Sequence, residues 1–521
     1  MTATTALPAH ARISAARRVT LTTRIPIPLL AVLGVQIALS FRLLFTNTAF
    51  IDEATYLYAG HQMLAHWTTG VSVENFPQFL SGSVAVYPPI GAIADDIGGL
   101  TGARLLGLAF MLATTVLLYR TTRRLFGPTA GVIAAALFAV LMGAQFLSAF
   151  ATFDPMALFL LALCAYLVLG VEADDSLWSM ARVVVLAALL LALANACKYA
   201  TALWDPILIA LVGLSPALAG REVTRKYAAG LAARFTVVLG VTLGAALLVA
   251  GPSYWSGIVY TTINRSSQQV GMGQSAGSVL HAAWQWIWPV LIPAALAVAW
   301  CVIRRRDVTA MLAVVLFTAA VVAPLNQARI GTLVSLQKHA VFGAWFGCIL
   351  VGRLFIALRA HRWRRNVALA IAGAGTAALL PITMNQATSA YQWPSMNPAF
   401  IAALRPLVHD GSQRYLIEGS AYITAYYVGV PNSTQWKESS DYTVANASGQ
   451  TLSGMAALTY GIKDEKFSLI ILSGVGPYEP GIQEVLAKHP QYQRIATLPP
   501  DTTQPGGRDF TVWRLNGVQA S

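Results

Sequence analysis

Residues 27–58, IPLLAVLGVQIALSFRLLFTNTAFIDEATYLY, decide the fold of this chain. Their first part, 27–45, is an apolar run long enough to cross a bilayer as a helix. Two adjacent carboxylates, Asp52 and Glu53, follow at the membrane boundary. Ionisable groups at this depth cost free energy unless they are paired or hydrated, so they frequently mark function. The same pair also suits the start of a helix, as an N-cap and its first-turn partner.

The composition is that of a polytopic membrane protein. Hydrophobic residues make up 56% of the 521 residues and charged residues only 11%, whereas soluble domains carry about a quarter charged residues. The four cysteines all fall inside apolar runs and form no CxxC pair, which predicts buried free thiols rather than disulfides. No small-residue cleavage site follows the first apolar run, so we expect it to remain as an uncleaved helix.

Apolar runs of spanning or near-spanning length recur along the chain and predict about eleven transmembrane helices. The runs are 27–45, 103–119, 129–147, 155–171, 183–197, 200–214, 235–251, 287–303, 308–325, 340–358 and 366–384.

The placement of lysine and arginine predicts a cytoplasmic N-terminus. With that orientation, the inner loops hold 20 of the 26 basic residues before position 390. Most of the formal net charge of +13 is therefore explained by topology, and no nucleic-acid partner is expected. The other six basic residues lie at or near the outer side, namely Arg42, Arg104, Lys198, Arg265, Arg329 and Lys338.

The domain organisation follows from this topology and a change in composition. We expect a cytoplasmic segment at 1–26, an all-α transmembrane domain at 27–390, and a small α/β domain at 391–521 outside the membrane. The first outer loop should carry two interfacial helices, at 52–67 and 87–100. Within the last domain we expect strands at 415–417, 467–472 and 510–515, and helices at 398–408 and 480–488.

The predicted topology places further ionisable residues on the same outer side as Asp52 and Glu53. Asp154 precedes Pro155 at the start of an apolar run, where it would also serve as an N-cap. Lys198 lies between two apolar runs and is a candidate site residue. A lysine in this place can also be one that only snorkels to the membrane interface. Arg329 and the Lys338-His339 pair lie in a later outer loop. Cations at this depth can hold a phosphate, and a carboxylate can activate a hydroxyl group.

An ordered series of short motifs resembles the GT-C membrane glycosyltransferases, in particular the protein O-mannosyltransferases and lipid A aminoarabinose transferases. The resemblance is good over residues 25–215 and fades to topology alone through 390. It rests on the Asp52-Glu53 pair, Tyr87-Pro88-Pro89, Gly102-Ala103-Arg104, Arg123-Arg124-Leu125-Phe126-Gly127, Thr152-Phe153-Asp154 and Lys198-Tyr199.

This resemblance implies transfer of a sugar from a polyprenyl-phosphate donor to an acceptor hydroxyl on the outer face of the plasma (inner) membrane. By position, Asp52 corresponds to the general base, with Glu53 as its supporting neighbour. Asp154 corresponds to a second acidic position that orients the acceptor, and Lys198 to a ligand of the donor phosphate. The predicted topology adds four candidate donor-phosphate ligands, namely Arg265, Arg329, Lys338 and His339.

The sequence leaves the sugar, a hexose or a pentose, and the acceptor, a glycan, lipid or protein, undetermined. Protein acceptors are not implied, because the large luminal insertion of the eukaryotic protein O-mannosyltransferases is missing. A divalent cation is possible on Asp52, Glu53, Asp154 and His61, but oxygen ligands at such spacing are too unspecific to assign one. Two rival functions are a lipid-linked sugar transporter or flippase, which predicts mid-membrane charges and repeats, and a non-catalytic scaffold with a sensing tail.

Overall fold

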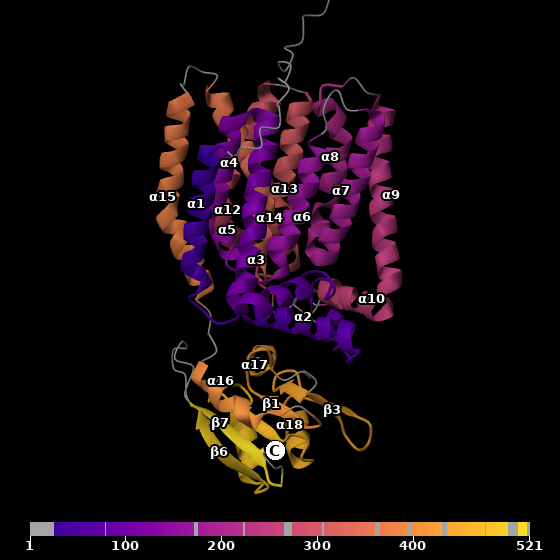
Figure 1. Cartoon of the computed structure of the whole chain (residues 1–521), viewed down its shortest axis with the longest axis vertical. Coiled ribbons are helices and arrows are strands. Elements are labelled where there is room, and N and C mark those ends of the chain that lie inside the picture. Colours follow the sequence, from indigo (N-terminus) through magenta and orange to yellow (C-terminus); the bar gives the residue numbers. More distant parts are fainter. Residues whose placement is uncertain are drawn as a thin grey trace, which may run out of the picture.

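The computed structural model describes residues 26–517, except 79, 171–175, 222–223, 265–272, 305–306, 360–364, 393–397, 410, 420, 430–434, 475 and 499–508. A bundle of long helices fills most of the molecule, and a small α/β region lies beyond one end of the bundle (Figure 1).

Each of the eleven predicted apolar runs overlaps a helix. The bundle helices are α1 (Ile27–Leu44), α3 (Tyr87–Phe126), α4 (Pro128–Val140), α5 (Met142–Leu147), α6 (Phe153–Val168), α7 (Leu177–Cys197), α8 (Asp205–Leu218), α9 (Arg225–Ala250), α12 (Ala276–Arg304), α13 (Val308–Ile330), α14 (Leu336–Arg359) and α15 (Arg365–Tyr391). Within the described residues, eight helical segments are long and apolar enough to cross a membrane, and α4 and α6 are shorter apolar helices. The protein is therefore a multi-pass membrane protein.

Helix α14 lies at the centre of the bundle, where most of its apolar segment is buried. It packs against α12, α13 and α4, and its Trp345 and Phe346 are fully enclosed. Helix α9, by contrast, lies at the side of the bundle and has only 11% of its apolar segment buried (Figure 1). Because apolar side chains that face lipid need no protein partner, this contrast fits a helix bundle in a membrane.

The two helices predicted at 52–67 and 87–100 are present. The first is α2 (Ile51–Thr69), which lies across one end of the bundle, as does the short α10 (Pro252–Val259) from a later part of the chain (Figure 1). The second predicted helix is the first part of α3, which is separated from the rest by a kink at Gly98 and Gly99. Gly99 has a φ of 61°, a conformation that glycine adopts without strain.

Helices α2 and α3 approach each other closely at Gly60. A Cβ atom at this position would lie only 2.0 Å from the carbonyl oxygen of Pro88. Only glycine therefore permits this contact between the two helices.

The C-terminal region is a small α/β fold, as predicted. Its five-stranded sheet has the order β2-β1-β5-β7-β6, in which β1 is parallel to β2 and β5, and β7 is antiparallel to β5 and β6. The strands are β1 (Tyr415–Ile417), β2 (Trp436–Glu438), β5 (Leu469–Leu472), β6 (Tyr492–Leu498) and β7 (Phe510–Leu515), with a separate hairpin of β3 (Thr443–Ala445) and β4 (Thr451–Ser453). The helices are α16 (Pro398–Leu404), α17 (Ala421–Val428), α18 (Gly454–Lys463) and α19 (Glu479–Ala487).

The three predicted strands correspond to β1, β5 and β7, and the two predicted helices to α16 and α19. The remaining strands and helices of this region were not predicted.

Helix α17 joins the C-terminal region to the bundle. Its Tyr426 hydroxyl donates a hydrogen bond to Asp95 in α3 at 2.7 Å. Its Tyr427 hydroxyl accepts one from the backbone N–H of Ala49, just ahead of α2, at 2.6 Å. The C-terminal region is thus fixed to the same end of the bundle at which α2 begins.

Candidate active site

Asp52 lies in the first turn of α2 and forms a salt bridge with Lys338 in the first turn of α14. The Asp52 side chain is 38% exposed, whereas that of Lys338 is only 6% exposed. The Lys338 ammonium group also lies 4.9 Å from the centre of the Phe150 ring, within the range of a cation–π contact. Asp52 therefore faces a buried cation and remains accessible from solution, and its side chain does not cap its own helix.

A second ion pair joins Asp154 and Lys198, with 2.7 Å between the Asp154 Oδ1 and Lys198 Nζ atoms. Asp154 lies in the first turn of α6, and Lys198 follows the last residue of α7. The hydroxyl of Thr152 donates a hydrogen bond to the other carboxylate oxygen of Asp154 at 3.0 Å. Both charged side chains are buried, which argues against a lysine that merely snorkels to the interface.

The two ion pairs and His339 form one electrostatic unit, which we call the ion-pair cluster: Asp52, Lys338, Asp154, Lys198 and His339. Lys198 interacts with Asp52 as well as with Asp154, and Lys338 interacts with both carboxylates. His339 is half-buried beside Lys198, Lys338 and Asp154, and its buried Nε2 atom has no hydrogen-bond partner among the described residues. The cluster gathers side chains from four separate helical segments at one end of the bundle.

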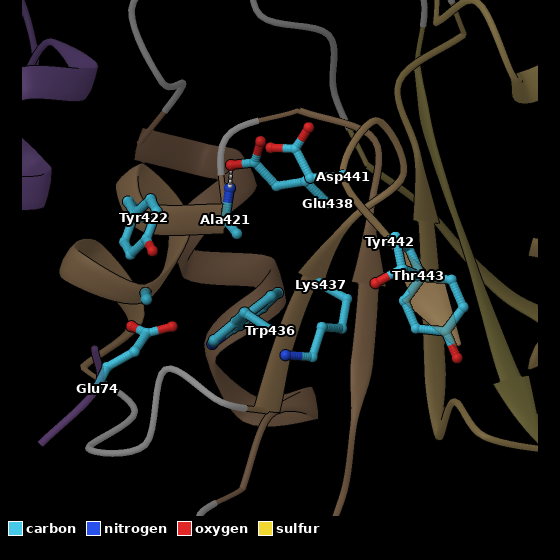
Figure 2. A pocket seen from close by; sticks show the side chains of 10 residues that line it. Glu74, Ala421, Tyr422, Trp436, Lys437, Glu438, Asp441, Tyr442 and Thr443 are labelled. Atoms are coloured by element: carbon cyan, nitrogen blue, oxygen red, sulfur yellow. Dashed lines mark hydrogen bonds between the residues drawn. The ribbon is translucent and has the colours of Figure 1, made fainter. Parts of the chain in front are cut away.

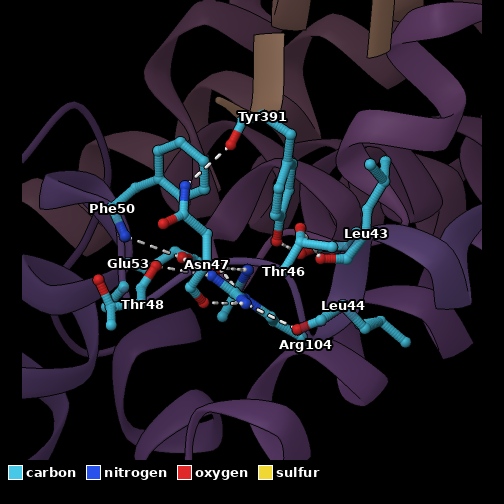
Figure 3. A network of polar contacts seen from close by, with 12 residues as sticks. Leu43, Leu44, Thr46, Asn47, Thr48, Phe50, Glu53, Arg104 and Tyr391 are labelled. Carbon is cyan, nitrogen blue, oxygen red and sulfur yellow. Dashed lines mark hydrogen bonds and ion pairs between the residues drawn. The ribbon is translucent and has the colours of Figure 1, made fainter. Parts of the chain in front are cut away.

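Unlike its neighbour Asp52, Glu53 belongs to a network of polar contacts with Arg104 (Figure 3). Its carboxylate binds Arg104 through two contacts, at 2.9 Å to Nε and 2.7 Å to Nη2. It also accepts hydrogen bonds from the backbone N–H groups of Phe50 at 3.0 Å and Ala151 at 2.8 Å.

Arg104 completes this network from the other side. Its Nη1 atom donates to the carbonyl oxygens of Leu44 at 2.7 Å and Asn47 at 2.9 Å, and its Nη2 atom donates to that of Thr48 at 3.1 Å. The Glu53 and Arg104 side chains are 0% and 1% exposed. We call this arrangement the Glu53–Arg104 network. It joins α2, α3 and the segment between α1 and α2, and its contacts stabilise the packing of these segments.

Two of the predicted phosphate ligands are not part of the ion-pair cluster as described. Arg329, at the end of α13, is exposed and donates to Asn326 of its own helix at 3.0 Å. Arg265 lies outside the described residues.

Of the four residues considered for a divalent cation, Asp52 and Asp154 belong to the ion-pair cluster, whereas Glu53 and His61 have separate partners. Glu53 is occupied by Arg104, and Asp52 and Asp154 each bind a lysine. His61 pairs instead with Asp95, at 2.8 Å from its Nε2 atom. Within the described residues, no group of three or more His, Cys, Asp or Glu side chains is arranged to hold a metal ion. This donor set, in which each carboxylate already has a cationic partner, does not fit a metal centre.

Sequence reasoning missed the partners of Arg104 and His61. Arg104 had been recognised as an outer-side cation within a family motif, but its partner Glu53 is 51 residues away. His61 and Tyr426 both bind Asp95, so one carboxylate connects α2, α3 and α17. The hydrogen bond with Asp95 raises the pKa of His61 above its usual value. No local sequence pattern marks this three-way contact.

Comparisons with known proteins agree with this fold. Residues 92–249 match the sequence model of a family described as dolichyl-phosphate-mannose-protein mannosyltransferase. No curated protein matches the sequence.

Several solved structures share the fold. ArnT from Cupriavidus metallidurans, in the apo state, has a TM-score of 0.60 and 14% identity, over 93% of this chain and 97% of that protein. The oligosaccharyltransferase AglB from Archaeoglobus fulgidus, in complex with an inhibitory peptide and a dolichol-phosphate, has a TM-score of 0.55 and 15% identity, over 86% of this chain and 69% of that one.

The arabinofuranosyltransferase AftD from Mycobacteria has a TM-score of 0.53 and 14% identity, over 93% of this chain and 41% of that protein. At such identities the likeness concerns the fold. The chain has the GT-C fold, and the resemblance predicted from the sequence motifs is confirmed.

Proposed function

We propose that this chain is a glycosyltransferase that moves a sugar from a polyprenyl-phosphate donor to an acceptor hydroxyl at the outer face of the membrane. The observation that carries the proposal is the accessible Asp52 carboxylate beside the buried Lys338 and Lys198 ammonium groups. Two proteins of similar fold support the donor class: ArnT has been solved with undecaprenyl phosphate, and AglB with a dolichol-phosphate.

The donor phosphate is assigned to Lys198 and Lys338, with His339 as a third polar group beside them. Both lysines are buried, and charges in such surroundings interact more strongly than in water. As the anomeric C–O bond breaks, negative charge grows on the departing phosphate, and fixed cations stabilise that charge. Arg329 is left out of this assignment because its guanidinium group is exposed and bonded to Asn326.

Asp52 is assigned as the general base. The acceptor hydroxyl attacks the anomeric carbon, its proton passes to Asp52, and the lipid phosphate leaves with the electron pair of the broken bond. A phosphate bound at Lys338 would replace Asp52 as the partner of that cation, which frees the carboxylate to accept the proton. Asp154 holds Lys198 in position and acts as a positioning residue.

The membrane orientation belongs to the same proposal. The lysine and arginine bias supports a cytoplasmic N-terminus, and the transmembrane domain at 27–390 then precedes an extracytoplasmic domain at 391–521 in the plasma (inner) membrane. All four native cysteines are buried, so single introduced cysteines can report topology. Ser448→Cys should react with a membrane-impermeant thiol reagent on intact cells, and Lys226→Cys should react only after lysis. The reverse pattern would overturn the orientation.

The activity is tested with purified protein and radiolabelled polyprenyl-phosphate sugars, hexosyl and pentosyl in separate reactions. Membranes from cells with and without the protein serve as acceptors. If the chain is a transferase, the parent protein forms a new glycosidic bond in this reaction and the Asp52→Asn variant does not. A transporter of lipid-linked sugars would instead change the sidedness of the donor without forming a glycosidic bond. Sugar transfer that persists at the parental rate in Asp52→Asn would rule out the assigned base.

A further inference from the structure

A pocket of about 240 Å³ lies between the C-terminal region and the segment that follows α2 (Figure 2). Its lining includes three aromatic residues, Tyr422, Trp436 and Tyr442, and three carboxylates, Glu74, Glu438 and Asp441. We propose that this pocket binds one sugar unit of an oligosaccharide acceptor, at a distance from the hydroxyl that reacts. The inference rests on the proposed function and names the acceptor class for it.

The combination of aromatic and carboxylate side chains favours a sugar as the occupant. The C–H groups of a sugar ring pack against electron-rich aromatic faces, and its hydroxyls donate hydrogen bonds to carboxylates, which are stronger than those between neutral groups. Pockets for drug-sized ligands measure about 300–1,000 Å³. A pocket of about 240 Å³ suits a single sugar ring rather than a larger ligand.

Trp436 provides a separate indication of a ligand. The residue is only 4% exposed, and its indole N–H group has no hydrogen-bond partner among the described residues. A buried donor without a partner costs free energy. Trp436 lines the pocket, and a bound sugar would have to present a hydroxyl or ring oxygen to this buried N–H group to satisfy it.

The charge of the pocket selects against the phosphate of the donor. Its lining holds three carboxylates and one lysine, Lys437. Glu438 accepts a hydrogen bond from the backbone N–H of Ala421 at 2.7 Å. A neutral glycan satisfies this lining, whereas an anion would be repelled. The pocket and the ion-pair cluster therefore suit different ligands.

Part of the pocket lining belongs to α17, the helix that joins the C-terminal region to the bundle. Tyr422 is in α17, and its ring centre lies 6.5 Å from that of Tyr58 in α2. Tyr58 is six residues beyond Asp52, roughly 9 Å along the helix axis. A sugar in the pocket is therefore not the sugar that reacts at Asp52. An acceptor that occupies both places must contain several sugar units.

Equilibrium binding to the full-length protein in detergent tests the inference without need of catalysis. The probes are two neutral trisaccharides, mannotriose and arabinotriose, and a phosphorylated mannotriose, followed by saturation-transfer NMR and calorimetry. We expect at least one neutral trisaccharide to bind and the phosphorylated one to bind more weakly than its neutral counterpart. Absence of binding by both neutral trisaccharides, or tighter binding of the phosphorylated one, would overturn the inference.

Substitutions of pocket residues test whether the trisaccharide binds in the pocket. Asp441→Asn and Glu438→Gln remove charged acceptors, and Trp436→Phe keeps an aromatic ring but removes the N–H donor. Each should weaken trisaccharide binding about tenfold or more, as for the loss of one hydrogen bond to a buried or charged group. The matched control is Glu484→Gln in the same region, an exposed carboxylate outside the pocket. Binding that is equally strong in all three pocket variants would place the site elsewhere.

Failure of this inference is distinguishable from failure of the proposed function. Asp52→Asn should bind the trisaccharide as the parent protein does, because Asp52 does not line the pocket. In turnover, Asp441→Asn should raise KM for an oligosaccharide acceptor about tenfold and leave kcat and the KM for the donor unchanged. Unchanged KM with intact transfer would reject the pocket and keep the transferase. Trisaccharide binding without transfer would reject the transferase and keep the pocket.

Discussion

Two carboxylates that are neighbours in the chain have opposite surroundings. Adjacent residues on a helix point about 100° apart, and at the start of α2 this separates Asp52 from Glu53. Glu53 is fully enclosed and binds Arg104 and two backbone N–H groups. Asp52 is 38% exposed, and its carboxylate pairs with Lys338 of another helix.

Under the proposed function, this difference separates stability from chemistry within one dipeptide. A buried charge with all its hydrogen bonds made holds elements together, but it has no capacity left for a substrate. A charge that is accessible and paired with a single side chain can exchange its partner. In the proposed function, the ion-pair cluster provides the reactive groups, and the Glu53–Arg104 network holds α2 in the position that presents them.

The largest effect is expected for Glu53→Gln. The substitution keeps the shape of the side chain but leaves the buried Arg104 charge without its partner, which typically costs 3–5 kcal/mol. Thermal unfolding in detergent should show a large drop in Tm and a loss of folded protein. The double variant with Arg104→Met should recover part of the stability, because no unpaired charge is then buried. Glu484→Gln, which removes an exposed carboxylate paired with Lys488, should leave Tm unchanged. A parental Tm in Glu53→Gln would remove the distinction between the two carboxylates.

Asp52→Asn should have the opposite profile, with an intact fold and a slow reaction. The amide cannot accept the acceptor's proton, and a general base contributes about 10² to 10⁴ in rate. We expect kcat to fall at least a hundredfold, with donor affinity close to that of the parent and a smaller loss of Tm than in Glu53→Gln, because Asp154 still interacts with Lys338. Single-turnover measurements with saturating donor separate this loss from slow product release. A variant that unfolds like Glu53→Gln would show that Asp52 also serves stability.

Lys198→Ala tests the cationic side of the cluster. Loss of a charge-assisted hydrogen bond to phosphate should weaken donor binding by about 1.5–3 kcal/mol. The matched comparison is Arg329→Ala, since Arg329 is exposed and bonded to its own helix; its donor affinity should remain within about 0.5 kcal/mol of the parent. Affinity for a polyprenyl-phosphate sugar, measured by competition, gives both values. Equal losses in the two variants would return Arg329 to the donor site.

The smallest effect is expected for the contact between His61 and Asp95, which ties α2 to α3 at a partly exposed position. The hydrogen bond with Asp95 raises the pKa of His61 above 6.5 in the folded protein. The stabilisation is therefore complete below pH 6.5 and is lost as the pH rises through the folded pKa. Because the His61 side chain is 33% exposed, its value is at most about 1 kcal/mol. The difference in Tm between the parent and His61→Gln should be larger at pH 5.5 than at pH 8.5, and a difference that does not change with pH would contradict this assignment.

The sequence predicts the spans and part of the last domain because both depend on local patterns. Each of the eleven apolar runs overlaps a helix, since apolar content over one segment suffices to place a span. In the C-terminal region, strands such as Leu469–Leu472 are buried apolar runs and were predicted. Short mixed strands such as Trp436–Glu438 exist only because they pair with a neighbour, so they have no signal of their own.

The candidate site was predictable in its residue types but not in its pairings. Outer-side cations and carboxylates were identified from topology, and the structure brings Asp52, Asp154, Lys198, Lys338 and His339 together. The partner of each charge depends on how segments that lie 44 to 286 residues apart in the sequence pack against one another. For the same reason the contrast between Asp52 and Glu53 was not visible, since both belong to one acidic pair in the sequence.

The backbone contact at Gly60 has a consequence for reading related sequences. Since even a methyl group there would collide with Pro88, the spacing of α2 and α3, and with it the location of Asp52, depends on a missing side chain. A sequence survey can use this position as a filter. Chains that keep the acidic pair but carry a larger residue in place of Gly60 must hold these helices farther apart. The location of the acidic pair in such chains should therefore differ from its location here.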